Sequence, residues 1–336
     1  MARLPLVRIA LVGLGTDWQQ RLSPAFEKMH SRVRVVAVFD DVALTALTAA
    51  GKWQAEAVLG VRQLLMRQDV DAILLRSAGW QRDWLLDRLR ERQLPVLLGP
   101  EVVLSRRQLD AWYRSSEDEG VIIIPELRLR YQPATLRLRE LQATALGRIS
   151  RLLIRVSAWR PFLQGTLALT QLLDWSTTLV NATPVEVAPA APGQRSAGGA
   201  AEICITFENV RAAESFPPVE LLLVWDEPIP SEPVGQPLGP LCEVTCEHGS
   251  AAVLTPHELQ WTVGDELRPE KLTSDRSSTE VVLDLFARRV LGGLIPTPDL
   301  RDWRRAQDLA EAVQTVQHHG KPIRWHATPG TERADR

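Results

Sequence analysis

The first apolar run and the turn that follows it constrain this chain more than any other stretch. Residues 7–12 are apolar apart from one arginine and lead into Gly13-Leu14-Gly15, and a helical pattern begins directly afterwards. Two glycines at this spacing allow a sharp turn and a close approach of the backbone to a pyrophosphate. A second apolar run, residues 33–39, is followed by Asp40. This acid lies close to the ~20 residues downstream of the glycine turn that are typical of a ribose-binding carboxylate. The order predicts a dinucleotide-binding βαβ unit.

The totals exclude several classes of protein. With 336 residues the chain exceeds one ordinary hydrophobic core, so two domains are expected. The net charge of −2 gives no basic excess for nucleic acid, and no apolar stretch approaches the ~18 residues of a membrane helix. Residues 7–12 are too short for a signal peptide. Three cysteines form no disulfide framework, which predicts a cytoplasmic protein.

Residues 1–125 alternate between strand and helix patterns. The strands are almost continuously apolar, which is typical of a parallel sheet covered by helices on both faces. We therefore predict a doubly wound, Rossmann-type α/β domain. Its expected strands are residues 7–12, 33–39, 71–75, 95–98 and 121–124.

The pattern changes after residue 125. A long alternating strand at 148–156 and a helix at 161–180 precede several short strands, and two helices at 279–291 and 298–318 close the chain. Alternation of this kind indicates a mostly antiparallel sheet with one open face. We predict an α+β domain over residues 126–326 with proline-rich loops at 188–201 and 226–240. A frayed tail is expected at 327–336.

Several segments stand in a definite order along the chain. They are Val12-Gly13-Leu14-Gly15, residues 35–40, residues 70–77, residues 94–105 around Gly99-Pro100-Glu101, residues 130–133, residues 145–149, and residues 309–323. In order and spacing they resemble the glucose–fructose oxidoreductase, inositol dehydrogenase and MocA family over nearly the whole chain. The resemblance implies a nucleotide-binding domain followed by an α/β domain whose open sheet is often buried in a dimer. It also implies hydride transfer between NAD(P) and a hydroxyl-bearing carbon of a sugar or cyclitol.

The catalytic residues of that family are missing at the matching positions. The motif lysine that binds the substrate hydroxyl falls on Pro100, and no lysine occurs between Lys52 and Lys271. The histidine that handles the proton falls on Gln171, which cannot accept a proton at neutral pH. The family's first aspartate falls on Leu167, and only its last acid remains, as Asp174. The family's Thr-Pro pair falls on Ser77-Ala78, and a nearby histidine falls on Arg82.

The phosphate turn itself is also altered. Trp18 stands where the third glycine of the motif allows close packing of helix and strand. Residues 16–19, Thr-Asp-Trp-Gln, predict a capping box, which would occupy N–H groups that a pyrophosphate needs. Asp17 adds negative charge beside that ligand. Whether NAD binds therefore stays open. If it binds, the expected contacts are Gly13, Gly15, Asp40 and Ser77. Asp40 would then favour NAD over NADP.

Three functions stay open. The first is a degenerate member of the family that has lost catalysis and serves in binding, scaffolding or regulation, with a possible protein partner. The second is an active NAD-dependent oxidoreductase with a rebuilt site, in which Glu101, Asp174 and Tyr131 supply acid–base groups beside Gln171. The third is a carrier whose interdomain cleft binds a small molecule through Arg128, Arg130 and Gln171.

Two further expectations concern metal and assembly. Cys242, Cys246 and His248 share one strand face by their spacing, so a zinc site with Cys204 as fourth ligand is conceivable. Positions four apart on a strand are ~13 Å apart, however, which favours buried, unliganded thiols; we predict no metal. We expect a homodimer formed through the sheet of the second domain, from the resemblance and the alternating strands.

Overall fold

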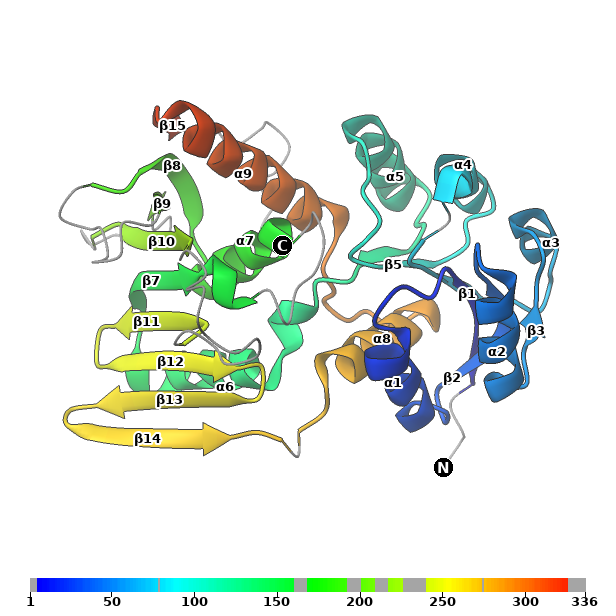
Figure 1. Ribbon diagram of the computed structural model, residues 1–336, viewed down its shortest axis with the longest axis horizontal. Coiled ribbons are helices and arrows are strands. Elements are labelled where there is room, and N and C mark those ends of the chain that lie inside the picture. The colour runs from blue at the N-terminus through cyan, green and yellow to red at the C-terminus, as the bar shows by residue number, and fades with distance from the viewer. Residues whose placement is uncertain are drawn as a thin grey trace. The chain divides into compact units, whose positions relative to one another are not determined.

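The computed structural model describes residues 5–77, 79–159, 168–191, 201–208, 217–225, 240–273 and 275–325 (Figure 1). The chain forms two compact units. The first consists of Met1–Tyr131 with Arg276–Arg304, and the second of Gln132–Asp275 with Arg305–Arg336. Residues 276–304 therefore return to the first unit, an excursion that the sequence pattern did not indicate.

The first unit contains a six-stranded parallel sheet in the order β3-β2-β1-β4-β5-β6, which confirms the predicted doubly wound domain. The central strands are apolar and buried on both faces, as a covered parallel sheet requires. The strand order reverses between β1 and β4, and ligands of such sheets bind where the order reverses. The strands are β1 (Val7–Val12), β2 (Val33–Phe39), β3 (Glu56–Ala57), β4 (Ala72–Leu75), β5 (Val96–Leu98) and β6 (Ile123–Pro125).

The helices of this unit pack on both faces of the sheet (Figure 1). A π-helical turn, η1 (Trp18–Leu22), precedes α1 (Ser23–Lys28), and both contribute to one core with residues of α8. Helix α8 (Ser278–Val290) begins with a capping box formed by Ser277 and Glu280. The remaining elements are α2 (Ala43–Trp53), α3 (Val61–Leu65), η2 (Gly79–Gln81), α4 (Arg82–Glu91), α5 (Arg106–Asp118) and η3 (Arg128–Tyr131).

The second unit contains a nine-stranded sheet in the order β14-β13-β12-β11-β7-β10-β9-β8-β15. Its strand pairs are antiparallel except for β7 with β10, which confirms the mostly antiparallel sheet. The strands are β7 (Ile149–Arg155), β8 (Thr183–Pro189), β9 (Ala201–Glu208), β10 (Val219–Trp225), β11 (Cys242–Cys246), β12 (Ser250–Thr255), β13 (Glu258–Val263), β14 (Glu266–Lys271) and β15 (Ile323–Arg324).

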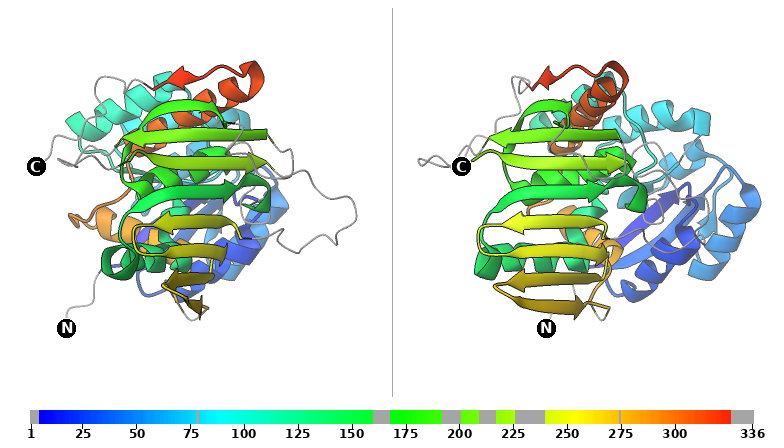
Figure 2. Two further views of the ribbon diagram at one scale, coloured as in Figure 1. Left: turned by 90° about the vertical axis from the view of Figure 1, so that its left-hand side faces the viewer. Right: turned by 60° about the vertical axis from the view of Figure 1, so that its left-hand side comes forward.

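Helices of the second unit lie along one face of this sheet. The left view of Figure 2 shows the opposite face, and none of the described helices crosses it. Trp175 anchors the covered side, because its indole is fully buried, donates to Thr135 Oγ1 at 3.0 Å and packs against Trp159. The helices are α6 (Pro133–Leu141), η4 (Gln142–Leu146), η5 (Val156–Trp159), α7 (Ala168–Val180) and α9 (Leu300–His319), which starts in the first unit. None of the helices in the described ranges is long and apolar enough to cross a membrane.

Candidate functional site

The glycine turn after β1 has the geometry that its sequence predicts. Gly13 has φ +69°, and a Cβ atom there would lie 2.2 Å from the carbonyl oxygen of Ser77. A side chain at this position is therefore excluded by both backbone conformation and space. The turn brings Gly13, Gly15, Asp40 and Ser77 together at the carboxyl edge of the parallel sheet.

Asp40 braces this turn from the end of β2. Its Oδ2 accepts a hydrogen bond from the Leu14 N–H at 3.0 Å, and its Oδ1 accepts one from the Val42 N–H at 2.9 Å. Both oxygens of the predicted ribose-binding carboxylate thus already have backbone donors. The turn donor at Leu14 likewise has an internal acceptor, which is a role that a bound anion fills in other glycine-rich turns.

Arg76 lies directly beneath the turn and is a residue that the sequence analysis did not single out. It follows the buried strand β4, and its side chain is only 1% exposed. A Cβ atom at Gly15 would lie 3.1 Å from Arg76 Nη2, and one at Gly99 would lie 2.6 Å from Arg76 Cδ. Arg76 therefore occupies space that a side chain at position 99 would need, and a side chain at position 15 would crowd its guanidinium.

Arg76 belongs to a cluster of alternating charges, which we call the Arg76 cluster. Its members are Asp17, Arg21, Arg76, Glu101, Glu126 and Arg128.

The contacts of the Arg76 cluster form a continuous network in the first unit. Arg76 Nη2 donates to Asp17 Oδ1 at 2.8 Å and to Glu101 Oε1, and Arg76 Nη1 donates to Glu126 Oε2 at 3.3 Å. Arg21 Nε donates to Asp17 Oδ2 at 2.6 Å. Arg21 Nη1 also donates to Glu126 and, at 2.8 Å, to Thr279 Oγ1 at the start of α8. Arg128 lies 3.7 Å from Asp17.

The electrostatics of the cluster keep two of its carboxylates, Asp17 and Glu126, ionised. Burial alone would raise the pKa of Asp17 and of Glu126, but the charges of Arg21, Arg76 and Arg128 outweigh it and lower both pKa values. Burial and the neighbouring Arg21 charge lower the pKa of Arg128 to about 10, so it stays protonated at neutral pH. Three cations thus face three anions, and the charge beside the glycine turn is balanced internally.

Glu101 reaches Arg76 from a tight turn after β5. The Val102 N–H donates to the Gly99 carbonyl at 3.1 Å, so residues 99–102 form a β-turn with Pro100 at its second position. Proline suits that position because its ring fixes φ. The predicted acid–base residue Glu101 is therefore the ion-pair partner of Arg76, and the position of the family lysine is a buried turn proline.

Two expectations about the helix start need correction. The predicted capping box of Thr16 and Gln19 is wrong, because no side-chain hydrogen bond caps this helix. The chain instead enters a π-helical turn in which the Ser23 N–H donates to the Trp18 carbonyl. Asp17 is held by arginines, so its negative charge is compensated. Trp18 is 7% exposed and packs against Phe26 in the core of the unit.

The other predicted site residues lie in the second unit. Gln171 and Asp174 stand on α7 and are 2% and 4% exposed. Gln171 Oε1 has no hydrogen-bond partner among the residues that the structure describes. Leu167 and Ala78 lie outside them. The structure thus brings Gln171 and Asp174 together on one helix, whereas Glu101, Asp40 and the glycines belong to the other unit.

The polar anchors considered for a carrier function are engaged in ion pairs. Arg128 belongs to the Arg76 cluster, and Arg130 Nη1 pairs with Asp302 Oδ2 at 3.1 Å. Tyr131 packs, partly buried, against the core of the first unit. Both arginines are therefore engaged in ion pairs within the first unit.

The considered zinc site is excluded by the register of the sheet. Cys204 pairs with Leu222, Leu222 with Leu153, and Leu153 with Glu243, so these residues share one face. Cys242 and Cys246 alternate with Glu243 and therefore point to the opposite face. Over the described ranges, no group of three or more potential metal ligands occurs.

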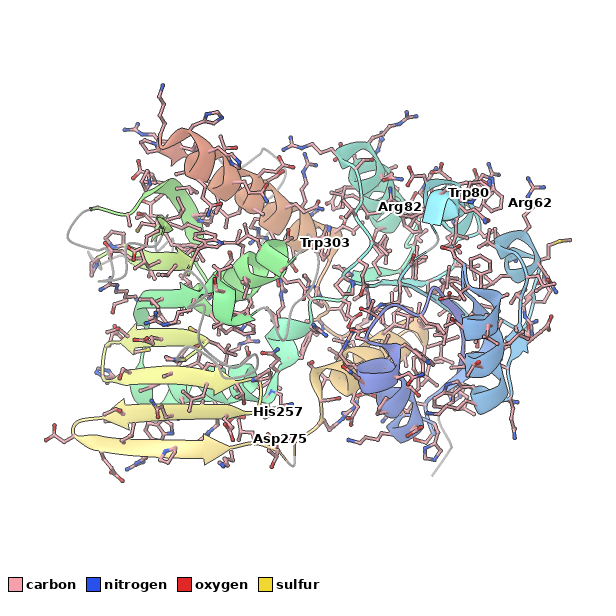
Figure 3. The ribbon with its side chains drawn as sticks, viewed as in Figure 1. Arg62, Trp80, Arg82, His257, Asp275 and Trp303 are labelled. Carbon is pink, nitrogen blue, oxygen red and sulfur yellow. The ribbon has the colours of Figure 1, made fainter. Side chains whose placement is uncertain are left out.

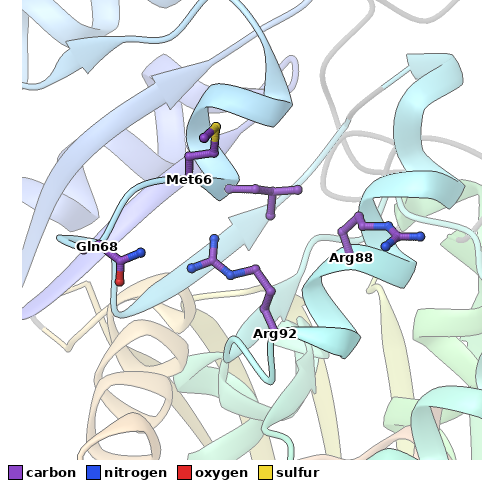
Figure 4. Close-up of a pocket in the computed structure, with 5 residues that line it drawn as sticks. Met66, Gln68, Arg88 and Arg92 are labelled. Carbon is purple, nitrogen blue, oxygen red and sulfur yellow. The ribbon is translucent and has the colours of Figure 1, made fainter.

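A shallow hollow in the first unit lies away from the glycine turn. It has a volume of about 390 Å³ and is lined by Leu65, Met66, Gln68, Arg88 and Arg92 (Figure 4). Gln68 and Arg92 precede β4 and β5, so the hollow lies at the amino edge of the sheet, opposite the turn. Trp80, in η2 just before α4, is 90% exposed and projects outward near Arg82, which pairs with Asp83 (Figure 3).

The fold is that of two-domain oxidoreductases of the glucose–fructose oxidoreductase, inositol dehydrogenase and MocA type, as the resemblance implied. Aldose–aldose oxidoreductase from Caulobacter crescentus, complexed with glycerol, has a TM-score of 0.72 and 14% identity, over 96% of this chain and 100% of that chain. Levoglucosan dehydrogenase, in complex with NADH and levoglucosan, has a TM-score of 0.70 and 13% identity, over 95% of this chain and 99% of that chain. A UDP-N-acetylglucosamine 3-dehydrogenase from Acidithiobacillus ferrooxidans has a TM-score of 0.67 and 17% identity, over 93% and 98%. Neither protein-family models nor curated proteins match the sequence of this chain.

Proposed function

We propose that this protein uses an oxidoreductase fold without hydride-transfer catalysis and acts as a binding, scaffolding or regulatory protein. The observation that supports this most is the Arg76 cluster, which places a buried guanidinium and its three carboxylate partners at the edge of the sheet where a dinucleotide would bind. Pro100 and Gln171 support the same conclusion, because neither side chain can take up or release a proton at neutral pH.

The residues at the turn fit a pyrophosphate poorly. A pyrophosphate needs free N–H donors and positive charge, but Leu14 N–H donates to Asp40 and the Arg76 guanidinium is neutralised by carboxylates. We therefore derive no reaction step through NAD(P).

Cofactor titration and a turnover screen test this proposal together. NAD, NADH, NADP and NADPH are titrated into the protein by calorimetry, with tryptophan fluorescence as a second signal because Trp18 adjoins Asp17. Sugars, polyols and sugar acids are then screened for turnover with each cofactor, alongside an active enzyme of the same fold as positive control. We expect no binding at millimolar cofactor and no turnover. Micromolar binding with turnover would favour the rebuilt NAD-dependent oxidoreductase instead.

A further inference from the structure

We propose that Glu101 occupies an anion-binding site on Arg76, and that a carboxylate or phosphate group of a small ligand competes with it for that site. The inference rests on the proposed function, because it assumes that no dinucleotide is resident at the turn. Glu101 would then act as an internal substitute for the ligand, and its displacement would couple ligand binding to a movement of the 99–102 turn.

Exposure singles out Glu101 among the three carboxylates of the cluster. The Glu126 side chain is 2% exposed and the Asp17 side chain 27% exposed, whereas the Glu101 side chain is 39% exposed. Among the residues that the structure describes, Glu101 forms an ion pair with Arg76 alone, whereas Asp17 and Glu126 each pair with Arg21 as well. Glu101 is thus the carboxylate that solvent, and a dissolved anion, can replace at the lowest cost.

The guanidinium groups retain donors for such an anion. Arg76 Nε and Arg21 Nη2 are buried and have no hydrogen-bond partner in the described part of the chain. The position that a Cβ atom would take at Gly99 lies 3.0 Å from Arg76 Nε and 3.2 Å from Glu101 Oε2, so Nε and the second Glu101 oxygen lie on the same side of this glycine. An anion that takes the place of Glu101 would therefore face a second Arg76 donor beside Nη2. Planar guanidinium donors match the oxygens of carboxylate and phosphate groups.

Charge balance favours the binding of an anion to Arg76 once the Glu101 carboxylate is removed. Three arginines face three carboxylates in the intact cluster, so without Glu101 one positive charge is uncompensated. An incoming anion restores the charge balance of the cluster, which water that enters at the partly exposed position of Glu101 cannot do. The carboxylates Asp17 and Glu126 remain as neighbours and limit the site to a small anion.

The test compares Glu101→Gln with the unaltered protein and with Glu91→Gln. Glu91 is a matched control, because it also pairs with one arginine, Arg88 at 2.6 Å, but on an exposed helix. Inorganic phosphate, pyrophosphate and malonate are titrated by calorimetry at constant ionic strength, and circular dichroism verifies the fold. We expect Glu101→Gln to bind at least one of these anions at least tenfold more tightly than the other two proteins.

The pattern of binding assigns the ligand class. Tighter phosphate or pyrophosphate binding indicates a phosphate-bearing ligand, and tighter malonate binding indicates a carboxylate-bearing one. A folded Glu101→Gln protein with no gain for any of the three anions would overturn the proposal. That failure is separate from a failure of the proposed function, which would appear as NAD(P) binding to the unaltered protein.

Discussion

Arg76 and Gly99 share one small volume in the first unit, because a Cβ atom at Gly99 would lie 2.6 Å from Arg76 Cδ. The resemblance aligns Gly99-Pro100-Glu101 with a Glu-Lys-Pro motif and so implies a glutamate at position 99. Glycine stands there in this chain, and Arg76 stands at the end of the neighbouring strand β4. The two features are physically linked, since the arginine occupies space that any side chain at position 99 would need.

This linkage predicts that Gly99→Ala destabilises the protein. The added methyl group must displace the buried Arg76 stem, and overpacking of this kind costs about 1–3 kcal/mol. In an Arg76→Ala background the same change should cost markedly less. Chemical unfolding of the two single variants and the double variant measures the coupling.

Gly51→Ala is the matched control for that experiment. Gly51 lies in α2, and no atom lies within 4 Å of its Cβ position. The added methyl group should be neutral or stabilise by about 0.4–1 kcal/mol. Equal costs for Gly99→Ala with and without Arg76 would contradict the linkage.

The carboxylates of the Arg76 cluster should differ strongly in their contribution to stability. Glu126→Gln removes the buried partner of Arg21 and Arg76 and leaves cationic groups without compensation, which typically costs about 3–5 kcal/mol. Glu101→Gln removes a carboxylate that is partly open to water, so we expect a loss of no more than about 1 kcal/mol. Urea unfolding at neutral pH measures the free energy of unfolding of both variants and of the unaltered protein. A larger loss for Glu101→Gln would show that the ranking by burial is wrong.

Stability should fall in acid because of the same carboxylates. The pKa values of Asp17 and Glu126 are lower in the folded protein than their ordinary values of 3.8 and 4.5. Their contribution is therefore fully present above about pH 4.5 and is lost as the pH falls through the folded-state pKa values. The gap in unfolding free energy between the unaltered protein and Glu126→Gln should shrink below pH 4.5. A gap that stays constant down to pH 3 would contradict this assignment.

The glycine turn could be predicted from sequence because its signal is local. Gly13, Gly15 and Asp40 are found by their spacing from two apolar strands, and the structure places them together. The partners of Arg76 are not local: Glu101, Glu126 and Asp17 stand 25, 50 and 59 residues away. Only the topology of the sheet brings these charged residues, which follow separate strands, close to one another. An arginine directly after a fully apolar strand was the one visible sign, because such strand ends are normally buried.

Two strands, β14 and β8, were not predicted from the sequence patterns, and the cause is physical in both cases. β14 combines charged residues with Pro269, which is tolerated because the strand lies at the edge of its sheet. β8 contains Pro184 and Pro189, and its last residues fall in the stretch predicted as a loop at 188–201. Most of that loop, residues 192–200, lies outside the described residues. Proline and charge content therefore obscure the pattern of strands whose pairing in the sheet decides the structure.

The three cysteines should be unreactive in the folded protein. All three are buried, and burial raises the pKa of Cys204 and of Cys246 to about 11 and raises that of Cys242 well above its ordinary value. Because the thiolate is the reactive form, an aromatic disulfide reagent at pH 8 should modify none of them on the time scale of minutes. Three equivalents should react after unfolding in urea, which serves as the internal control. Rapid reaction of one thiol in the native protein would show that its strand opens readily.

Assembly through the sheet of the second unit remains a prediction. The face without described helices carries Leu153, Leu222, Val224 and Cys204, which pack together with Ala190 as a second apolar cluster. Four of these residues are already buried within the chain, so the prediction of a dimer rests on the family resemblance and the alternating strands. Light scattering at micromolar concentration should give twice the chain mass of 37.5 kDa. Thr245→Arg, an exposed change on the same face, should yield a monomer, whereas Thr48→Arg on exposed α2 should stay dimeric. A monomer in the unaltered protein would contradict the prediction.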